Sequence, residues 1–76
     1  MRTVDEYMQL PWTIVVRHHA EQGGYWSAEV AELPGCLYAT KDRSELLSEL
    51  DVALRMVLES MIEHGDLIPE PAATPV

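Results

Sequence analysis

The stretch GGYWSAEVAELPGCLYAT, residues 23–40, most constrains what this chain can fold into, because it contains two reversals and two short alternating runs. Tyr25–Ala31 has the period-two alternation of a half-buried strand. Pro34 cannot donate a ladder hydrogen bond, so this strand must end near Leu33. Pro34 and Gly35 fit the centre of a type II turn, where proline presets φ and glycine accepts a positive φ. Leu33, Pro34 and Gly35 are therefore predicted to set the reversal between two antiparallel strands, rather than to form a binding loop.

Two neighbouring runs extend this hairpin into a sheet. Residues 12–19, WTIVVRHH, are rich in β-forming side chains and contain no breaker, which predicts a strand. The face that carries Thr13 and Arg17 is the more polar one and is expected to meet water or a partner. Residues 36–40 predict a short third strand. The expected sheet is a three-stranded antiparallel β-meander.

A long amphipathic helix is predicted after the sheet. Asp42 and Ser44 compete as its N-cap, Glu45 fits the capping-box position, and His64-Gly65 is a typical C-terminal signal. Apolar residues recur at steps of three and four: Leu46, Leu50, Ala53, Leu54, Val57, Met61 and Ile62. Further apolar side chains flank this stripe, namely Leu47, Val52, Met56 and Leu58. Because one packed face needs less apolar surface, we expect this helix or the sheet edge to lie in a subunit contact.

The two ends of the chain are expected to differ. Thr3 and Glu6 fit a capping box, and Pro11 disfavours helix before it, so residues 3–9 predict a short helical turn. Three prolines fall in the last eight residues, and residues 71–76 are expected to form a flexible Pro-rich tail. The predicted fold class is α+β: a three-stranded antiparallel β-meander packed on one long α-helix, with a short N-terminal helical turn. Residues 1–70 form its single domain.

The small size of the chain favours self-association. Domains of about this length commonly depend on disulfides, metals or oligomerisation. Cys36 is the only cysteine among 76 residues, so it cannot form an intramolecular disulfide and is expected to fill the core. His18 and His19 point to opposite faces of a strand, so at most one can join His64, and no metal site is expected. A homodimer or higher oligomer without cofactor is predicted.

The charge of the chain limits its partners. It carries 13 acidic and 5 basic residues, for a net charge of −8. Nucleic-acid binding depends on Lys and Arg that displace counterions, so no direct contact with DNA or RNA is expected. A basic protein is a better match, although the same charge also serves solubility alone. No secretory signal and no apolar run long enough for a membrane span is seen, so a cytoplasmic location is expected.

Four carboxylates leave an enzymatic alternative open. Metal-dependent nucleases bind two metal ions with clustered acids, and the candidates here are Glu29, Glu32, Asp42 and Glu45. Helix capping accounts for two of these, Asp42 and Glu45. Neither Ser27 nor Ser44 has a histidine at a spacing that suggests a triad. A protein without catalytic activity is therefore predicted.

The order of the segments resembles the HicB-like antitoxin family over residues 12–71. The resemblance rests on Gly24-Tyr25-Trp26, Glu32-Leu33-Pro34-Gly35-Cys36, Asp42 and Ile68-Pro69-Glu70-Pro71. Each segment alone is a weak signature, whereas their order and spacing together are fairly specific. The chain is similar to short, solitary members that lack the C-terminal DNA-binding domain.

The resemblance implies both a fold and a mode of action. The family's N-terminal domain is a small α/β unit, likened to part of a ribonuclease H fold without its catalytic carboxylates. It typically neutralises HicA, a small basic RNA-cleaving toxin. Many members also repress their own operon through a DNA-binding domain, which is not carried over here. The chain departs from the pattern at Lys41, where glycine is frequent, and at Arg43, where threonine or serine is common.

Occlusion of a basic toxin would use exposed carboxylates. The predicted partner-binding residues are Glu29, Glu32, Asp42, Glu45 and Glu49. The alternatives are a degenerate ribonuclease H-like metal-dependent nuclease that uses the same acids, and a solitary oligomeric scaffold of unknown ligand.

Overall fold

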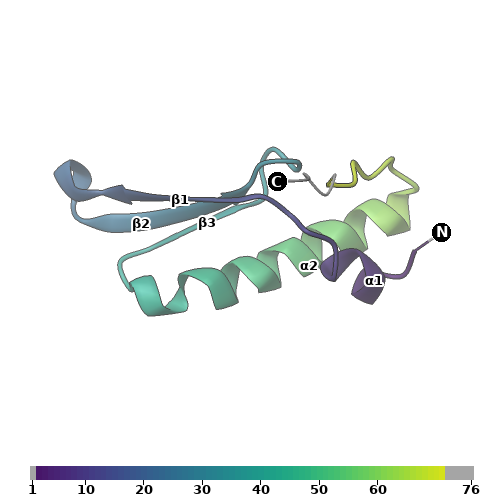
Figure 1. The fold of residues 1–76 in the computed structure, drawn as a ribbon, viewed down its shortest axis with the longest axis horizontal. Coiled ribbons are helices and arrows are strands. Elements are labelled where there is room, and N and C mark those ends of the chain that lie inside the picture. The colour runs from purple at the N-terminus through teal and green to yellow at the C-terminus, as the bar shows by residue number, and fades with distance from the viewer. Residues whose placement is uncertain (1, 72–76) are drawn as a thin grey trace.

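The computed structural model describes residues 2–71 of the chain. A three-stranded antiparallel sheet lies against one long helix, which confirms the predicted α+β fold (Figure 1). The elements are α1 (Val4–Met8), β1 (Ile14–His19), the 3-10 turn η1 (Ala20–Gln22), β2 (Tyr25–Val30), β3 (Leu37–Thr40), the 3-10 turn η2 (Arg43–Glu45) and α2 (Leu46–His64). Strand ends differ from the predicted ones by one or two residues.

The sheet has the order β1-β2-β3, so β2 is central and the other two strands are edges. In its register Ala28 lies opposite Val16 on one side and Tyr38 on the other. Between β2 and β3, Gly35 has a φ of +94°, and the Cys36 amide donates to the Leu33 carbonyl at 3.0 Å. This is the geometry that a type II turn with Pro34-Gly35 at its centre requires.

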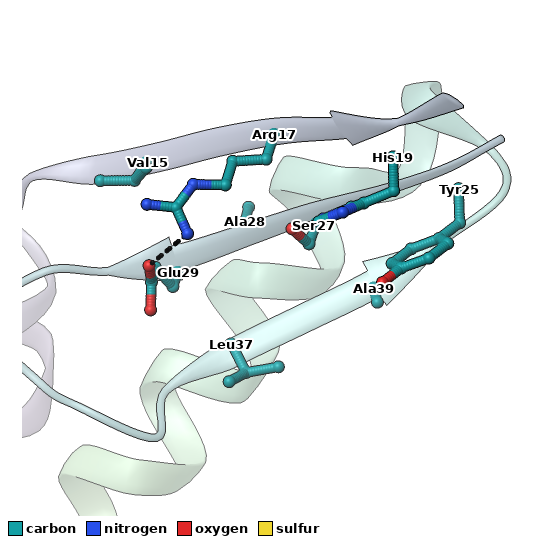
Figure 2. A pocket seen from close by; sticks show the side chains of 9 residues that line it. All are labelled: Val15, Arg17, His19, Tyr25, Ser27, Ala28, Glu29, Leu37 and Ala39. Carbon is teal, nitrogen blue, oxygen red and sulfur yellow. Dashed lines mark hydrogen bonds and ion pairs between the residues drawn. The ribbon is translucent and has the colours of Figure 1, made fainter. Parts of the chain in front are cut away.

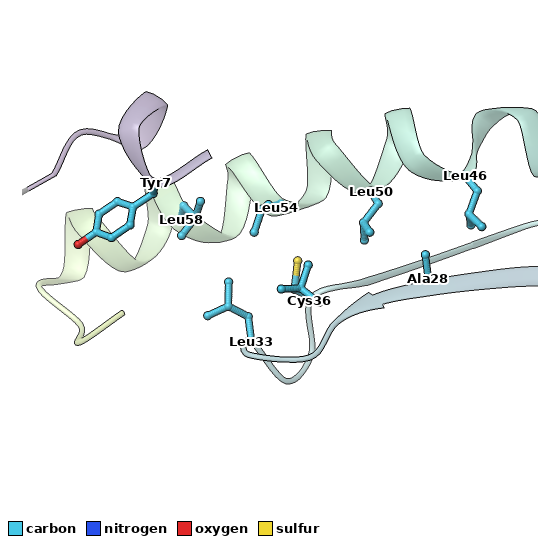
Figure 3. Close-up of a cluster of buried hydrophobic side chains, with 9 residues drawn as sticks. Tyr7, Ala28, Leu33, Cys36, Leu46, Leu50, Leu54 and Leu58 are labelled. Carbon is cyan, nitrogen blue, oxygen red and sulfur yellow. The ribbon is translucent and has the colours of Figure 1, made fainter. Parts of the chain in front are cut away.

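The core lies between the sheet and α2. Four leucines spaced by four residues, Leu46, Leu50, Leu54 and Leu58, line the sheet-facing side of the helix (Figure 3). They meet the buried side chains of Ala28, Val30, Leu33 and Cys36, and α1 adds Tyr7. Leu58 is 0% exposed, so the prediction that it flanks the apolar stripe is wrong. Burial raises the pKa of the Cys36 thiol, which fits its predicted place in the core.

The short helix α1 is held at both ends. Thr3 and Glu6 form the predicted capping box, with each side chain bonded to the other's backbone amide. Trp12 Nε1 donates to the Tyr7 carbonyl at 2.8 Å, which fixes the chain between α1 and β1. The C-terminal segment packs back on the body, since Pro71 is buried. Residues 72–76 of the predicted tail lie outside the described residues.

Helix α2 packs mainly against β2 and β3. Ile14 and Val16 of β1 share the helix-facing side with Ala28 and Val30 but remain 37% and 46% exposed. The sheet is therefore wider than the helix that covers it, and β1 keeps apolar surface in contact with solvent.

Candidate protein-binding surfaces

Two of the five acids predicted to contact a partner make contacts with neighbouring residues of the sheet instead. Glu32 accepts hydrogen bonds from the amide of Thr13 at 2.9 Å and from its hydroxyl at 2.8 Å. Glu29 lies 3.7 Å from the guanidinium of Arg17, its diagonal neighbour on β1, on the exposed face. Both carboxylates thus hold β1 to the following chain.

The other three predicted acids lie around the start of α2. Asp42 caps η2, since its carboxylate accepts from the Ser44 amide at 2.9 Å and from the Ser44 hydroxyl at 2.6 Å. Glu45 and Glu49 are exposed, and no ion pair is found for either of them within residues 2–71. Of the five, these two are the carboxylates that no internal contact uses.

Local hydrogen bonds lower the pKa of three carboxyl groups. The Thr13 amide is the main cause for the pKa of Glu32, the Ser44 hydroxyl for that of Asp42, and the Thr3 amide for that of Glu6. In each case the donated hydrogen bond favours the charged carboxylate over the neutral acid. These acids therefore serve the fold in their ionised form.

The domain is expected to lose stability in acid because of these bonds. A carboxyl group whose pKa is lowered in the folded state stabilises the fold when the pH is above its ordinary pKa, which is 4.5 for glutamate. This stabilisation is lost as the pH falls through the lower pKa of the folded state. Glu32→Gln should therefore reduce the drop in thermal unfolding temperature between neutral pH and about pH 3. Glu63→Gln, at an exposed position whose side chain has no hydrogen bond within residues 2–71, is the matched control and should keep the wild-type drop. Equal pH dependence in both variants would contradict the role given to Glu32.

The side of α2 that faces away from the sheet carries an acidic ridge, here called the outer stripe. Its members follow one another at alternating steps of four and three residues: Glu45, Glu49, Val52, Met56, Glu59 and Glu63. At 3.6 residues per turn this spacing places them on one side of the helix, opposite the buried leucines. All six are exposed, with Val52 at 56% and Met56 at 66%. The stripe combines four carboxylates with a central apolar pair.

A basic residue beside the stripe, Arg55, is already paired. Arg55 donates to Asp5 of α1 at 2.6 Å, an exposed contact that ties α1 to α2. The stripe therefore presents negative charge around an apolar centre, which suits a basic partner with a small apolar patch. Glu59 and Glu63 were not among the predicted site residues. They continue the alternating steps of four and three residues that run through Val52 and Met56. This spacing is the signal in the sequence that identifies the outer stripe.

The exposed face of the sheet forms a second surface. It holds a shallow concavity of about 270 Å³ lined by both edge strands and β2 (Figure 2). His19 Nε2 lies 2.8 Å from the Ser27 hydroxyl, and its ring stacks on Tyr25 at 4.3 Å between centroids. Arg17 and Glu29 occupy the other half of this face.

The Ser27–His19 pair brings together a hydroxyl and an imidazole that the sequence did not connect. A catalytic serine also needs a third group that orients the histidine. Within residues 2–71 no carboxylate is hydrogen-bonded to the His19 ring. The pair thus has the character of a cross-strand contact on a sheet surface.

The histidines do not converge. His18 stacks on Trp26 at 4.0 Å on the helix-facing side, whereas His19 lies on the exposed face. In the part of the chain that the structure describes, no three His, Cys, Asp or Glu side chains gather closely enough to hold a metal ion. Over the same residues, no helix has both the length and the apolar character to cross a membrane.

Comparison with known proteins gives one informative relative. The chain is 30% identical over 60 residues to the UPF0150 protein Ta0767 of Thermoplasma acidophilum. The matched region covers 79% of this chain and 84% of that protein. UPF0150 is a HicB-like family. No family model matches the chain, and no solved structure matches it.

Proposed function

This chain belongs to the UPF0150 family, and on that premise we propose that it is an antitoxin-type binding protein. It neutralises a small basic RNA-cleaving toxin, of the HicA-like kind, by covering the toxin's RNA-binding surface. The observation that carries this proposal is the outer stripe of α2. Within residues 2–71, none of its four carboxylates takes part in a hydrogen bond or ion pair, and its two apolar side chains are exposed.

The dimensions of the stripe suit a helix that docks in a groove. From Glu45 to Glu63 it extends over about 27 Å, at 1.5 Å per residue. A helix of this kind lays one side into a partner's groove and is read at positions three and four residues apart. Val52 and Met56 lie at the middle of the stripe, where the apolar centre of an interface is expected.

Charge and apolar contact have separate parts in the proposed complex. The glutamates at both ends speed encounter with a basic protein and reject acidic ones. Val52 and Met56 then lose their exposed area, and full burial of such a side chain contributes about 1.5–3 kcal/mol. The flexible thioether of Met56 adapts to the shape of the groove.

Occlusion follows from competition for the same basic surface. An RNA-cleaving toxin holds its substrate with Lys and Arg side chains that meet phosphates. A row of carboxylates on α2 offers those side chains an alternative set of negative charges. The toxin cannot contact the stripe and an RNA backbone with one surface at the same time, so RNA cleavage stops while the complex lasts.

An RNA-cleavage assay tests the proposal. A purified HicA-like toxin is incubated with RNA, and this protein is added up to an equimolar amount. Cleavage is expected to fall in proportion to the protein added, because each complex removes one toxin molecule. Unchanged cleavage at an excess of protein would contradict the proposal.

The protein alone, with RNA and Mg²⁺ or Mn²⁺, is the control for the nuclease alternative. No cleavage is expected. Cleavage that is abolished by Asp42→Asn and Glu29→Gln would replace the proposed binding role with a catalytic one.

A further inference from the structure

Within residues 2–71, strand β1 leaves a row of backbone groups without a partner strand. It lies at an edge of the sheet, with β2 on one side only (Figure 1). The Ala31 amide donates to the Thr13 carbonyl at 2.9 Å, so the amides of Val15 and Arg17 also face β2 by alternation. The amides and carbonyls of Ile14, Val16 and His18 then face outward. An edge of this kind is a template for a further strand.

The side chains of β1 do not protect this edge. Ile14 and Val16 are 37% and 46% exposed on the helix-facing side, where α2 leaves them partly uncovered. Natural edges are usually blunted by charged side chains, prolines or bulges. Within Ile14–His19 only Arg17 carries a fixed charge, and its ion pair with Glu29 holds it over the exposed face.

The charge distribution identifies the occupant. Residues 7–20 contain no Asp or Glu and form the longest acid-free stretch of a chain with a net charge of −8. Two copies of so acidic a chain repel each other across most surfaces, and the four glutamates of the outer stripe make that side unsuitable for self-association. Repulsion between acidic residues of the two copies is least at β1, and β1 also carries the partly exposed apolar side chains of Ile14 and Val16. A second copy of this chain therefore fits the edge better than it fits any part of α2.

We propose that β1 pairs antiparallel with β1 of a second copy, centred on Val16, so that two three-stranded sheets become one continuous sheet of six strands. Val16 lies opposite Val16 of the second copy, and Ile14 lies opposite His18. The outward amides of all three residues are then hydrogen-bonded. Both α2 helices lie on the same side of the joined sheet. The two Val16 side chains lie next to each other on that side, and each covers apolar surface of the other.

Other registers are less favourable. Centring the pair on Arg17 places two arginines directly opposite each other, which destabilises a sheet. Centring it on Val15 places His18 opposite Trp12, whose amide already donates to the Leu10 carbonyl at 2.9 Å. A slip of one residue in a single strand turns the helix-facing sides to opposite faces. Val16 is the centre that avoids all three problems.

Val16→Pro tests the edge pairing directly. The Val16 amide faces away from β2, so proline there removes no hydrogen bond within the monomer. The wild type is expected to sediment as a dimer at micromolar concentration. Val16→Pro loses the two central hydrogen bonds and should raise the dimer dissociation constant at least about tenfold. Ala39→Pro is the matched control, because the Ala39 amide faces the other edge by the same alternation. It should leave the dimer unchanged.

A disulfide trap tests the register independently of proline. Residues directly opposite in a hydrogen-bonded antiparallel pair have Cα atoms about 5.5 Å apart, within the range of disulfides. Val16→Cys is therefore expected to form a covalent dimer on oxidation. Val52→Cys, exposed on the outer stripe, should not, and Cys36 is buried.

Three results would overturn the proposal. They are a wild type that stays monomeric across the micromolar range, a Val16→Pro variant that dimerises as well as the wild type, and a wild-type dimer that Val16→Cys does not trap. The dimer does not depend on toxin binding. A protein that dimerises through β1 but fails to inhibit the toxin would refute the proposed function alone, and the reverse result would refute the pairing alone.

Discussion

Replacing Leu50 with alanine is expected to lower the free energy of unfolding by about 2–5 kcal/mol. Leu50 is 1% exposed and lies midway along the leucine row that faces the sheet, so the lost methyl groups leave a cavity between α2 and β2. Domains of this size have roughly 5 kcal/mol of stability in total. The variant should therefore be largely unfolded in mild denaturant. Urea unfolding followed by far-ultraviolet circular dichroism measures the change.

Leu47→Ala is the matched control for Leu50→Ala. Leu47 lies on the same helix with the same side chain but is 56% exposed. Its truncation is expected to change stability by no more than about 0.5 kcal/mol. Similar losses at both positions would contradict the assignment of the core face, and a small loss at Leu50 would show that the sheet and α2 do not share one core.

Reversing the charge of Glu59 is expected to weaken binding of a HicA-like toxin roughly tenfold to hundredfold, because a lysine in the stripe faces the basic partner with like charge. Glu59 is exposed, its carboxylate has no hydrogen bond or ion pair within residues 2–71, and surface substitutions of this kind usually change stability by no more than about 0.5 kcal/mol. The fold should therefore tolerate Glu59→Lys. Titration calorimetry with the purified toxin measures the affinity.

Glu21→Lys changes the net charge by the same amount at a distance from the stripe. Glu21 is exposed in η1, at the hairpin between β1 and β2. If only net charge mattered, both variants would weaken binding equally. A large loss at Glu59 with a small one at Glu21 supports the stripe as the contact. Equal losses would place the contact elsewhere or make it non-specific.

The backbone organisation could be predicted because local rules act at particular residues. Pro34 and Gly35 have few conformations available between two alternating runs, and Gly65 ends α2 with a φ of +70°. The Thr3–Glu6 capping box was also readable, since both partners lie within one turn. In each case the residues that determine the structure are neighbours in the sequence.

Features that depend on packing between distant elements could not be predicted. Periodicity gives the direction of an apolar face but not its width, and Leu58 was consequently placed outside the core that buries it. How much of β1 remains uncovered depends on where α2 crosses the sheet, which no local pattern encodes. The Ser27–His19 contact depends on the cross-strand register and on a diagonal between neighbouring pairs.

The candidate site shows the same division. Asp42 was considered as the cap of the long helix, but its carboxylate caps the 3-10 turn η2 ahead of α2 and is occupied by Ser44. The predicted capping-box contact of Glu45 is not formed. Nothing in the sequence shows that Glu32 holds Thr13, because the two residues meet only when β1 and the end of β2 lie side by side. The predicted set of five acids therefore combined carboxylates that stabilise the fold with others that remain available to a partner.

Calorimetric titration of a purified HicA-like toxin with this protein, at low and at high salt, tests most directly whether the protein binds a basic toxin through its exposed charges. Saturable binding that weakens as salt rises is predicted, because salt screens exposed charges separated by more than about 10 Å at 0.1 M. Absence of binding at low salt, or an affinity that does not change with salt, would contradict it.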